Sequence, residues 1–166
     1  ALGAKNVIGI ARNKEKLERS LQYGADFVIN STDKDANAIS KEFRELCKGK
    51  ELPNFGWKIF EVTGAKGGQE IALALLGFTG KLIVIGFGMA KTEYAIGRLM
   101  AFDAEVMGSW GCLPEYYPIV LDMILAKKID MGPFVETRPM STIAQTFAEV
   151  HKAGSPAKRI VLTPDF

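Results

Sequence analysis

The residues best suited to hold a ligand stand where five apolar runs of the sequence end. Three of these ends contain glycine: Thr63-Gly64, Gly86-Phe87-Gly88 and Ser109-Trp110-Gly111. Glycine at such a point lets a flat ligand lie against the backbone, although glycine also serves simply to turn the chain. The other two ends, Ala11-Arg12-Asn13 and Asn30-Ser31, are polar. Taken singly each glycine indicates a turn, whereas the whole set favours a cofactor cleft.

Residues that carry metal or redox chemistry are scarce. Cys47 and Cys112 stand far apart without a second cysteine or a histidine near either, so the sequence predicts neither a zinc knuckle nor a redox pair. His151 is the only histidine, and it falls in the polar part of a predicted helix, which favours a surface position. We therefore expect no metal-binding residue in this chain.

Composition and charge exclude several classes of partner. Of 166 residues, 48% are hydrophobic and 24% charged, which is typical of a globular domain. The net charge of +2, from 21 basic and 19 acidic side chains, offers no electrostatic basis for binding nucleic acid or an anionic membrane. No apolar run reaches the roughly 18 residues of a membrane span, and the N-terminus lacks a signal-peptide pattern. We expect a protein of the reducing cytoplasm.

The elements that must position these turns alternate along the chain. Buried-strand patterns are followed by amphipathic helical patterns, which predicts a parallel α/β sheet with right-handed crossovers. Ligands bind beyond the carboxyl ends of such strands, where the five turns lie. We expect strands at 6–11, 26–30, 57–62, 81–86 and 104–110, helices at 14–23, 35–48, 69–78 and 115–127, and a short helical piece near 98–100.

Three local signals refine this scheme. Ser31-Thr32-Asp33 offers capping residues for the second helix. Near the end of the chain, 134–139 is expected to be extended, Ser141 to cap a helix through about residue 152, and 159–163 to form a closing strand. The sequence thus changes character in its last part, from about residue 134.

Four stretches carry a resemblance to a known family. The sequence contains NVIGIARNKEKLERSLQYGADFVINSTD, GWKIFEVTGAKGGQEIALALLGFTGKLIVIGF, AEVMGSWGC and AKRIVLTP, in that order. Nearly all of the chain is thus similar to the C-terminal part of the medium-chain, zinc-type alcohol dehydrogenases. The resemblance implies a Rossmann-type doubly wound parallel sheet over residues 1–112, lacking its first strand and glycine-rich turn. Residues 113–166 would return to a catalytic domain.

The resemblance places the catalytic machinery upstream of this sequence. Ala1-Leu2-Gly3-Ala4 already has the pattern of a helix end. The phosphate-binding turn, the zinc ligands and the proton-relay hydroxyl would all precede it, so no catalytic residue is expected here. We also expect a gap between the strands at 7–11 and 57–62, and poor folding of residues 1–166 alone.

Cofactor contacts follow position by position from the resemblance. Ala11 stands where NAD-specific relatives have an acidic residue that binds the adenosine ribose, and Arg12 follows it. A missing carboxylate beside an arginine suits the 2′-phosphate of NADP, yet arginine also stacks on adenine, so we expect NAD, with NADP as the alternative. Lys16 would reach the ribose. Further contacts would be Val62, Thr63 and Gly64 under the adenosine, Ile85, Gly86 and Phe87 at the carboxamide, Met107 with Gly108 at the ring, and Arg159 at the pyrophosphate.

The activity implied is hydride transfer between a secondary alcohol and a nicotinamide cofactor, with zinc bound outside this chain. The substrate would be a small-molecule alcohol, including a cyclic hydroxyacyl-CoA, and the protein a homodimer or homotetramer joined through the strand near 104–110. Two alternatives remain: a zinc-independent enoyl or quinone reductase of the same superfamily, and a non-catalytic nucleotide-binding domain. Trp57, Phe102 and Trp110 are expected in the core or in a substrate-cleft wall.

Overall fold

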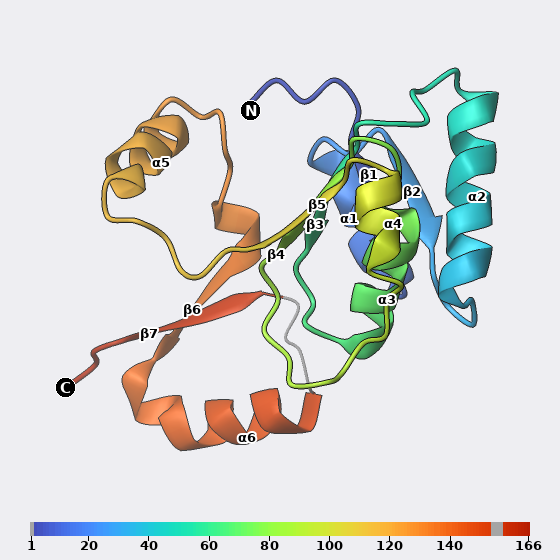
Figure 1. Cartoon of the computed structure of the whole chain (residues 1–166). Helices are drawn as coiled ribbons and strands as arrows, with labels where there is room; N and C mark the ends of the chain where they lie inside the picture. Colours follow the sequence, from blue (N-terminus) through green and yellow to red (C-terminus); the bar gives the residue numbers. More distant parts are fainter. Residues whose placement is uncertain (1, 154–157) are drawn as a thin grey trace. The chain divides into compact units, whose positions relative to one another are not determined.

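The structure, a computed structural model, describes residues 2–153 and 158–166 (Figure 1). The chain forms two compact units, Gly3–Gly111 and Cys112–Phe166. None of the helices in the described ranges is both long and apolar enough to cross a membrane.

Strands and helices alternate throughout the first unit, as the sequence predicted. All its strand pairs are parallel, so the expected α/β class is confirmed. The elements are β1 (Ile8–Ala11), α1 (Lys14–Gln22), β2 (Phe27–Asn30), α2 (Ala36–Gly49), β3 (Lys58–Glu61), α3 (Lys66–Leu75), β4 (Lys81–Val84), α4 (Gly97–Ala101) and β5 (Glu105–Gly108).

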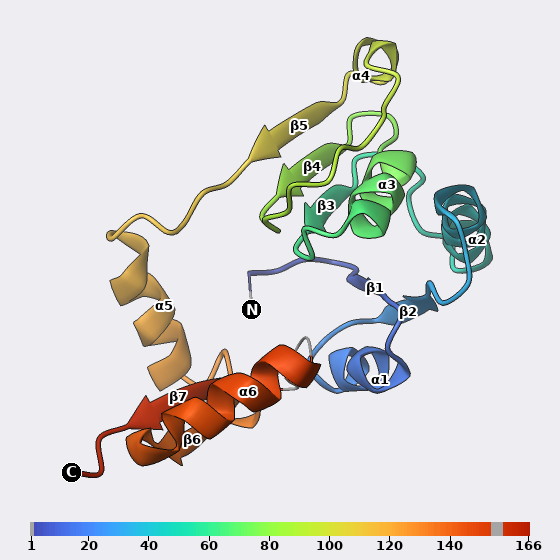
Figure 2. The same ribbon diagram turned by 90° about the horizontal axis from the view of Figure 1, so that it is seen from below.

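The strands of this unit form two separate ladders. β1 pairs with β2, and β3, β4 and β5 pair in that order, as Figure 2 shows for the second group. Within the described residues no ladder joins β1 to β3, which is where the sequence predicted a gap. Helices α2 and α3 pack together instead, and the Ser40 hydroxyl donates to the Ala74 carbonyl at 3.2 Å. Helix packing therefore holds the two ladders in one unit.

The core consists of two apolar clusters. The stripe of α2, with Ile39, Phe43 and Cys47, is buried against Ile29 of β2. Ala72 and Leu76 are buried against Leu82 of β4 in the second cluster. Removing this surface from water is the main stabilising term of the unit. Trp57 packs on the first cluster, and its ring meets that of Phe43 edge-on, which confirms its expected core position.

Two helix starts differ from the sequence prediction. The cap of α2 is Asp35, whose carboxylate accepts the Ala38 amide at 2.7 Å, rather than a residue of 31–33. Helix α3 begins at Lys66 instead of 69, because Gly67 and Gly68 are part of its first turn. A Cβ at Gly68 would overlap the Thr63 hydroxyl, whereas one at Gly67 would meet nothing. The second glycine is thus needed for close packing of the helix start.

The cysteines differ sharply in their surroundings. Cys47 is buried in the α2 cluster, and burial raises the pKa of its thiol, while Cys112 is exposed. We expect iodoacetamide at about pH 8 to modify Cys112 in the folded protein and Cys47 only after denaturation, since the thiolate is the reactive form. Intact mass before and after denaturation would show one adduct and then two. Equal labelling of both thiols in the folded state would contradict the buried position of Cys47.

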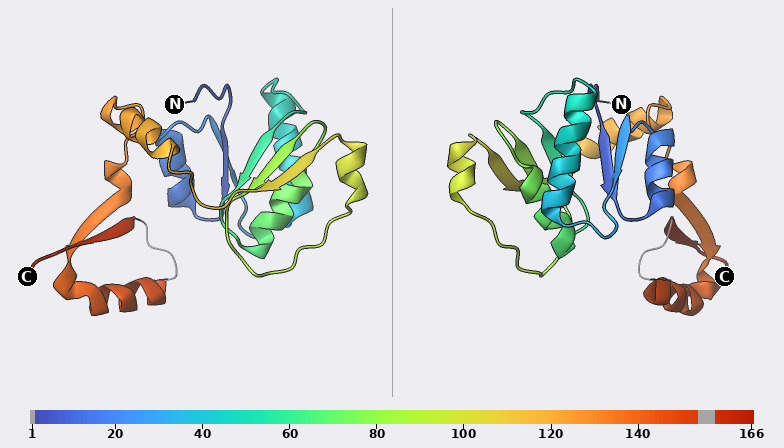
Figure 3. Two further views of the ribbon diagram at one scale, coloured as in Figure 1. Left: turned by 60° about the vertical axis from the view of Figure 1, so that its left-hand side comes forward. Right: turned by 90° about the vertical axis from the view of Figure 1, so that its right-hand side faces the viewer.

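The second unit contains α5 (Tyr116–Leu125), β6 (Val135–Pro139), α6 (Ile143–Ala153) and β7 (Arg159–Thr163), with 3-10 turns at Gly132–Phe134 and Met140–Thr142. β6 and β7 pair in parallel, with α6 between them in the chain, as seen in Figure 3. Ser141 does not cap α6 as expected. Its amide and hydroxyl donate to the Asp165 carboxylate, and the residue lies in the 3-10 turn before the helix. The expected strand 159–163 is confirmed.

The side chains of helix α5 and of Trp110 are more exposed to solvent than the sequence suggested. No side chain of α5 is buried, although Met123 and Ile124 are half-buried. Trp110 is 91% exposed, so it is not a core residue, whereas His151 is exposed as predicted. That residues 113–166 pack on a catalytic domain stays a prediction.

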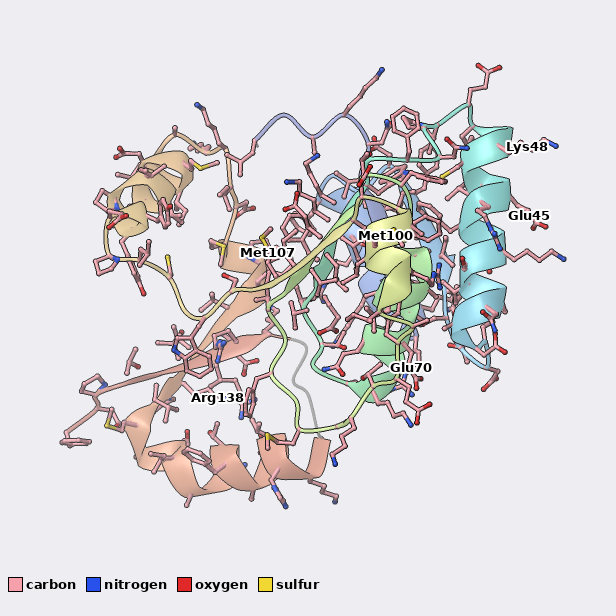
Figure 4. All side chains as sticks on the ribbon, viewed as in Figure 1. Glu45, Lys48, Glu70, Met100, Met107 and Arg138 are labelled. Carbon is pink, nitrogen blue, oxygen red and sulfur yellow. The ribbon has the colours of Figure 1, made fainter. Side chains whose placement is uncertain are left out.

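Arg138 of β6 forms ion pairs within its own strand and with helix α6 (Figure 4). Its guanidinium lies 2.6 Å from both the Glu136 and the Glu149 carboxylates, and the hydrogen bond from Arg138 lowers the pKa of Glu149. A carboxylate whose pKa is lower in the folded than in the unfolded protein stabilises the fold at pH values above its unfolded pKa of about 4.3. This stabilisation is lost as the pH falls through the pKa of the folded state. We expect Glu149→Gln to lower the thermal midpoint at neutral pH and to flatten its fall on acidification. An unchanged pH profile, matching that of Glu115→Gln, would refute this.

Candidate functional site

The carboxyl ends of β3, β4 and β5 lie side by side because the three strands run parallel and in register. Glu61 is opposite Val84, and Val84 is opposite Gly108. The ladder continues past the strands, since the Ile85 amide donates to the Glu61 carbonyl at 2.8 Å and the Ser109 amide to the Val84 carbonyl at 2.9 Å. The turns predicted at 62–64, 86–88 and 109–111 therefore leave the same edge of one sheet (Figure 2).

Two of these turns, Val62–Gly64 and Gly86–Gly88, pack backbone against backbone. Gly64 has φ +66°, and a Cβ there would overlap the Phe87 carbonyl. A Cβ at Gly88 would overlap the Gly64 carbonyl, and one at Gly86 would overlap the Gly64 amide. The sequence left open whether these glycines serve a ligand or the turn. In the structure they permit the close approach of one turn to the other.

A residue that the sequence analysis did not single out lies beneath both turns. Glu61, the last residue of β3, is only 4% exposed. Its carboxylate accepts the Thr63 amide at 2.8 Å, the Gly64 amide at 3.1 Å and the Thr63 hydroxyl. The signal that could have revealed it is a lone acid between the apolar residues Phe60 and Val62 of a strand pattern, since a carboxylate that becomes buried requires hydrogen-bond donors.

Apolar side chains surround the turns on their open side. Val62, Ile85, Phe87 and Met107 are all exposed, and Figure 4 shows Met107 on β5. The Phe87 ring meets the Trp110 ring edge-on, with their centroids 6.5 Å apart. The strand ends thus present an exposed apolar surface beside the two turns, and apolar side chains are the usual lining of a small-molecule site.

The end of β1 provides a different, basic part of the candidate site. The Arg12 carbonyl accepts hydrogen bonds from Thr32 Oγ1 at 2.9 Å and Asn30 Nδ2 at 3.3 Å, which holds the backbone in place. The side chains of Arg12 and Lys16 are exposed, and Ala11, the last residue of β1, is half-buried. Because Arg12 and Lys16 are basic and position 11 carries no carboxylate, the end of β1 presents positive charge.

Not every predicted contact residue lies in this unit. Arg159 is an exposed residue at the start of β7 and belongs to the second unit, so its contact with a cofactor stays a prediction. The residues described by the structure also include no group of three or more His, Cys, Asp or Glu side chains that could hold a metal ion. These residues do not fit a zinc site.

A parallel α/β sheet with interlocked glycine turns at its carboxyl edge defines a Rossmann-like domain. The chain belongs to the zinc-binding dehydrogenase family, whose model matches residues 1–126. Galactitol 1-phosphate 5-dehydrogenase of Escherichia coli (strain K12) is 24% identical over 171 residues, covering 98% of this chain and 47% of the relative. Sorbitol dehydrogenase of Ovis aries is 21% identical over 155 residues, covering 93% and 42%. The chain spans about half the length of these relatives.

Solved structures show the same fold. The crystal structure of galactitol-1-phosphate dehydrogenase from Escherichia coli matches with a TM-score of 0.81 at 23% identity, covering 98% of this chain and 47% of that one. A short chain alcohol dehydrogenase from Escherichia coli CFT073, solved with NADH, has a TM-score of 0.75 at 19% identity, covering 96% and 45%. These likenesses confirm the expected Rossmann-type architecture.

Proposed function

We propose that this chain is the cofactor-binding part of an oxidoreductase that transfers a hydride between a secondary alcohol and a nicotinamide cofactor. The observation that carries the proposal is the interlocked pair of turns, Val62–Gly64 and Gly86–Gly88, at the carboxyl edge of a parallel sheet. Family membership and relatives named as alcohol and polyol dehydrogenases support it. The nicotinamide ring, when bound, supplies the hydride acceptor or donor.

The residues of this chain would bind and orient that cofactor. We assign Val62, Thr63 and Gly64 to the adenosine, the backbone of Ile85, Gly86 and Phe87 to the carboxamide, Met107 and Gly108 to the nicotinamide ring, and Arg159 to the pyrophosphate. Ala11, Arg12 and Lys16 would face the adenosine ribose. NAD is the proposed cofactor, supported by the NADH-bound structural relative, and NADP is the alternative.

The substrate and metal form the finer part of the proposal. Zinc would be held outside this chain, because the described residues provide no ligand cluster. The resemblance favours a cyclic hydroxyacyl-CoA, specifically 6-hydroxycyclohex-1-ene-1-carbonyl-CoA, and the apolar strand ends with Phe87 and Trp110 support a ring-bearing substrate over a polyol. The free edge of β5, which pairs only with β4 among the described strands, would join subunits of a cytoplasmic homodimer or homotetramer.

The test uses the intact protein that carries this chain. NADH titration by fluorescence, zinc analysis and alcohol-dependent reduction of NAD would each give a positive result. Oxidation of the cyclic acyl-CoA alcohol in preference to sorbitol or galactitol 1-phosphate would support the finer proposal. Reduction of a carbon–carbon double bond without zinc would identify an enoyl or quinone reductase instead. Binding of NADH without turnover of any alcohol would support the alternative of a non-catalytic nucleotide-binding domain.

A further inference from the structure

Glu61 is a buried acid for which the proposed cofactor contacts give no role. None of the ion pairs found among the described residues includes it, so its carboxylate is met by N–H and O–H donors alone. A carboxylate removed from water is tolerated only when such donors surround it. The Glu61 carboxyl group is therefore held by the main-chain and hydroxyl donors of the turn that follows it.

The donors come from the turn that follows β3. Oε1 accepts the Thr63 amide at 2.8 Å, the Gly64 amide at 3.2 Å and the Thr63 hydroxyl, and Oε2 accepts the Gly64 amide at 3.1 Å. The Thr63 hydroxyl in turn accepts the Ala65 amide at 3.1 Å. The amides of this turn thus point inward to Glu61, which leaves Val62 on the exposed side.

Glu61 also reaches the second turn. Its carbonyl accepts the Ile85 amide at 2.8 Å and the Gly86 amide at 2.9 Å. Its Oε2 lies so close beneath Gly86 that a Cβ there would stand 2.8 Å from it. One residue therefore holds both turns through its main chain and its side chain.

We propose that Glu61 is a positioning residue for the cofactor, whose carboxylate holds the Val62–Gly64 turn against the Gly86–Gly88 turn. This inference rests on the proposed function. Because the Thr63 and Gly64 amides are bound to Glu61, they are not free to bind an anion, and the turn exposes the apolar Val62 side chain instead. Loss of the carboxylate would release those amides and loosen the surface on which the cofactor lies.

The test compares Glu61→Gln with Glu70→Gln in the intact protein. Glu70 is a half-exposed acid on α3 that pairs with Lys66 at 3.7 Å (Figure 4). Glutamine keeps the shape of Glu61 but places an NH₂ group against the Gly64 amide, so the NADH dissociation constant should rise about tenfold. The kcat at saturating cofactor should stay within about twofold, and Glu70→Gln should change neither quantity.

Stability and binding are measured together so that a purely structural role is recognised. A lower thermal midpoint with an unchanged dissociation constant for NADH would overturn the inference, as would a loss of kcat alone. If Glu61→Gln does not fold, Glu61→Asp serves as the second variant. Its shorter side chain draws the carboxylate away from the Thr63 and Gly64 amides, so NADH binding should weaken, and an unchanged dissociation constant overturns the inference. Absence of NADH binding by the wild type would refute the proposed function itself. Amide exchange at Gly64 without cofactor, slow in the wild type and fast in Glu61→Gln, separates these failures.

Discussion

Replacement of Gly64 by alanine is expected to lower the free energy of unfolding by about 2–4 kcal/mol, because the new Cβ meets a rigid backbone and L-residues are strained at positive φ. The obstructing atom is the Phe87 carbonyl oxygen, which no rotamer change can move, and φ is +66°. The new Cβ would force the Val62–Gly64 turn away from the Gly86–Gly88 turn, so the affinity for NADH should fall together with the stability. Chemical denaturation and fluorescence titration measure the two effects.

Gly67→Ala is the matched control for this substitution. It lies in the first turn of α3, and a Cβ there would meet nothing within 4 Å. Alanine has the higher helix propensity, so stability should stay equal or rise by up to about 1 kcal/mol. Unchanged stability and NADH binding in Gly64→Ala would show that the two turns do not pack as described.

The second large effect is expected at Ala11, where Ala11→Asp should shift the preference between the two cofactors toward NAD by about tenfold or more. A carboxylate at the end of β1 would accept hydrogen bonds from both ribose hydroxyls and repel a 2′-phosphate. The neighbouring backbone is held by Thr32 and Asn30, so the new side chain should not disturb the fold.

Arg12→Ala provides the complementary measurement. If the exposed guanidinium binds a 2′-phosphate, NADP affinity should fall and NAD affinity should hardly change. If it stacks on adenine, both affinities should fall together. The ratio of kcat/KM values for NAD and NADP in the wild type and both variants distinguishes these cases. An unchanged ratio in Ala11→Asp would show that this strand end does not face the ribose.

The order of elements could be predicted from the sequence because it depends on local patterns. Apolar runs predicted all the strands from β1 to β5, and helix α2 buries one apolar face with Ile39, Phe43 and Cys47, as its amphipathic pattern implies. Helix starts were harder to predict. Asp35 rather than an earlier residue caps α2, and Ser141 bonds to Asp165 far along the chain. Several neighbouring residues have capping side chains, and only the folded backbone selects one.

The candidate site shows the same division. The sequence by itself determined which strand ends carry the glycine turns, because the order of strands along the chain and the residues of each turn depend only on neighbouring residues. Only the tertiary structure decided that Gly64, Gly86 and Gly88 accommodate one another, and that Glu61 supports both turns. The reason is physical: close backbone approach and the capture of amides by a buried carboxylate depend on two segments that meet only when β3 and β4 pair. The pattern of residues along the sequence does not contain the distances between these two segments.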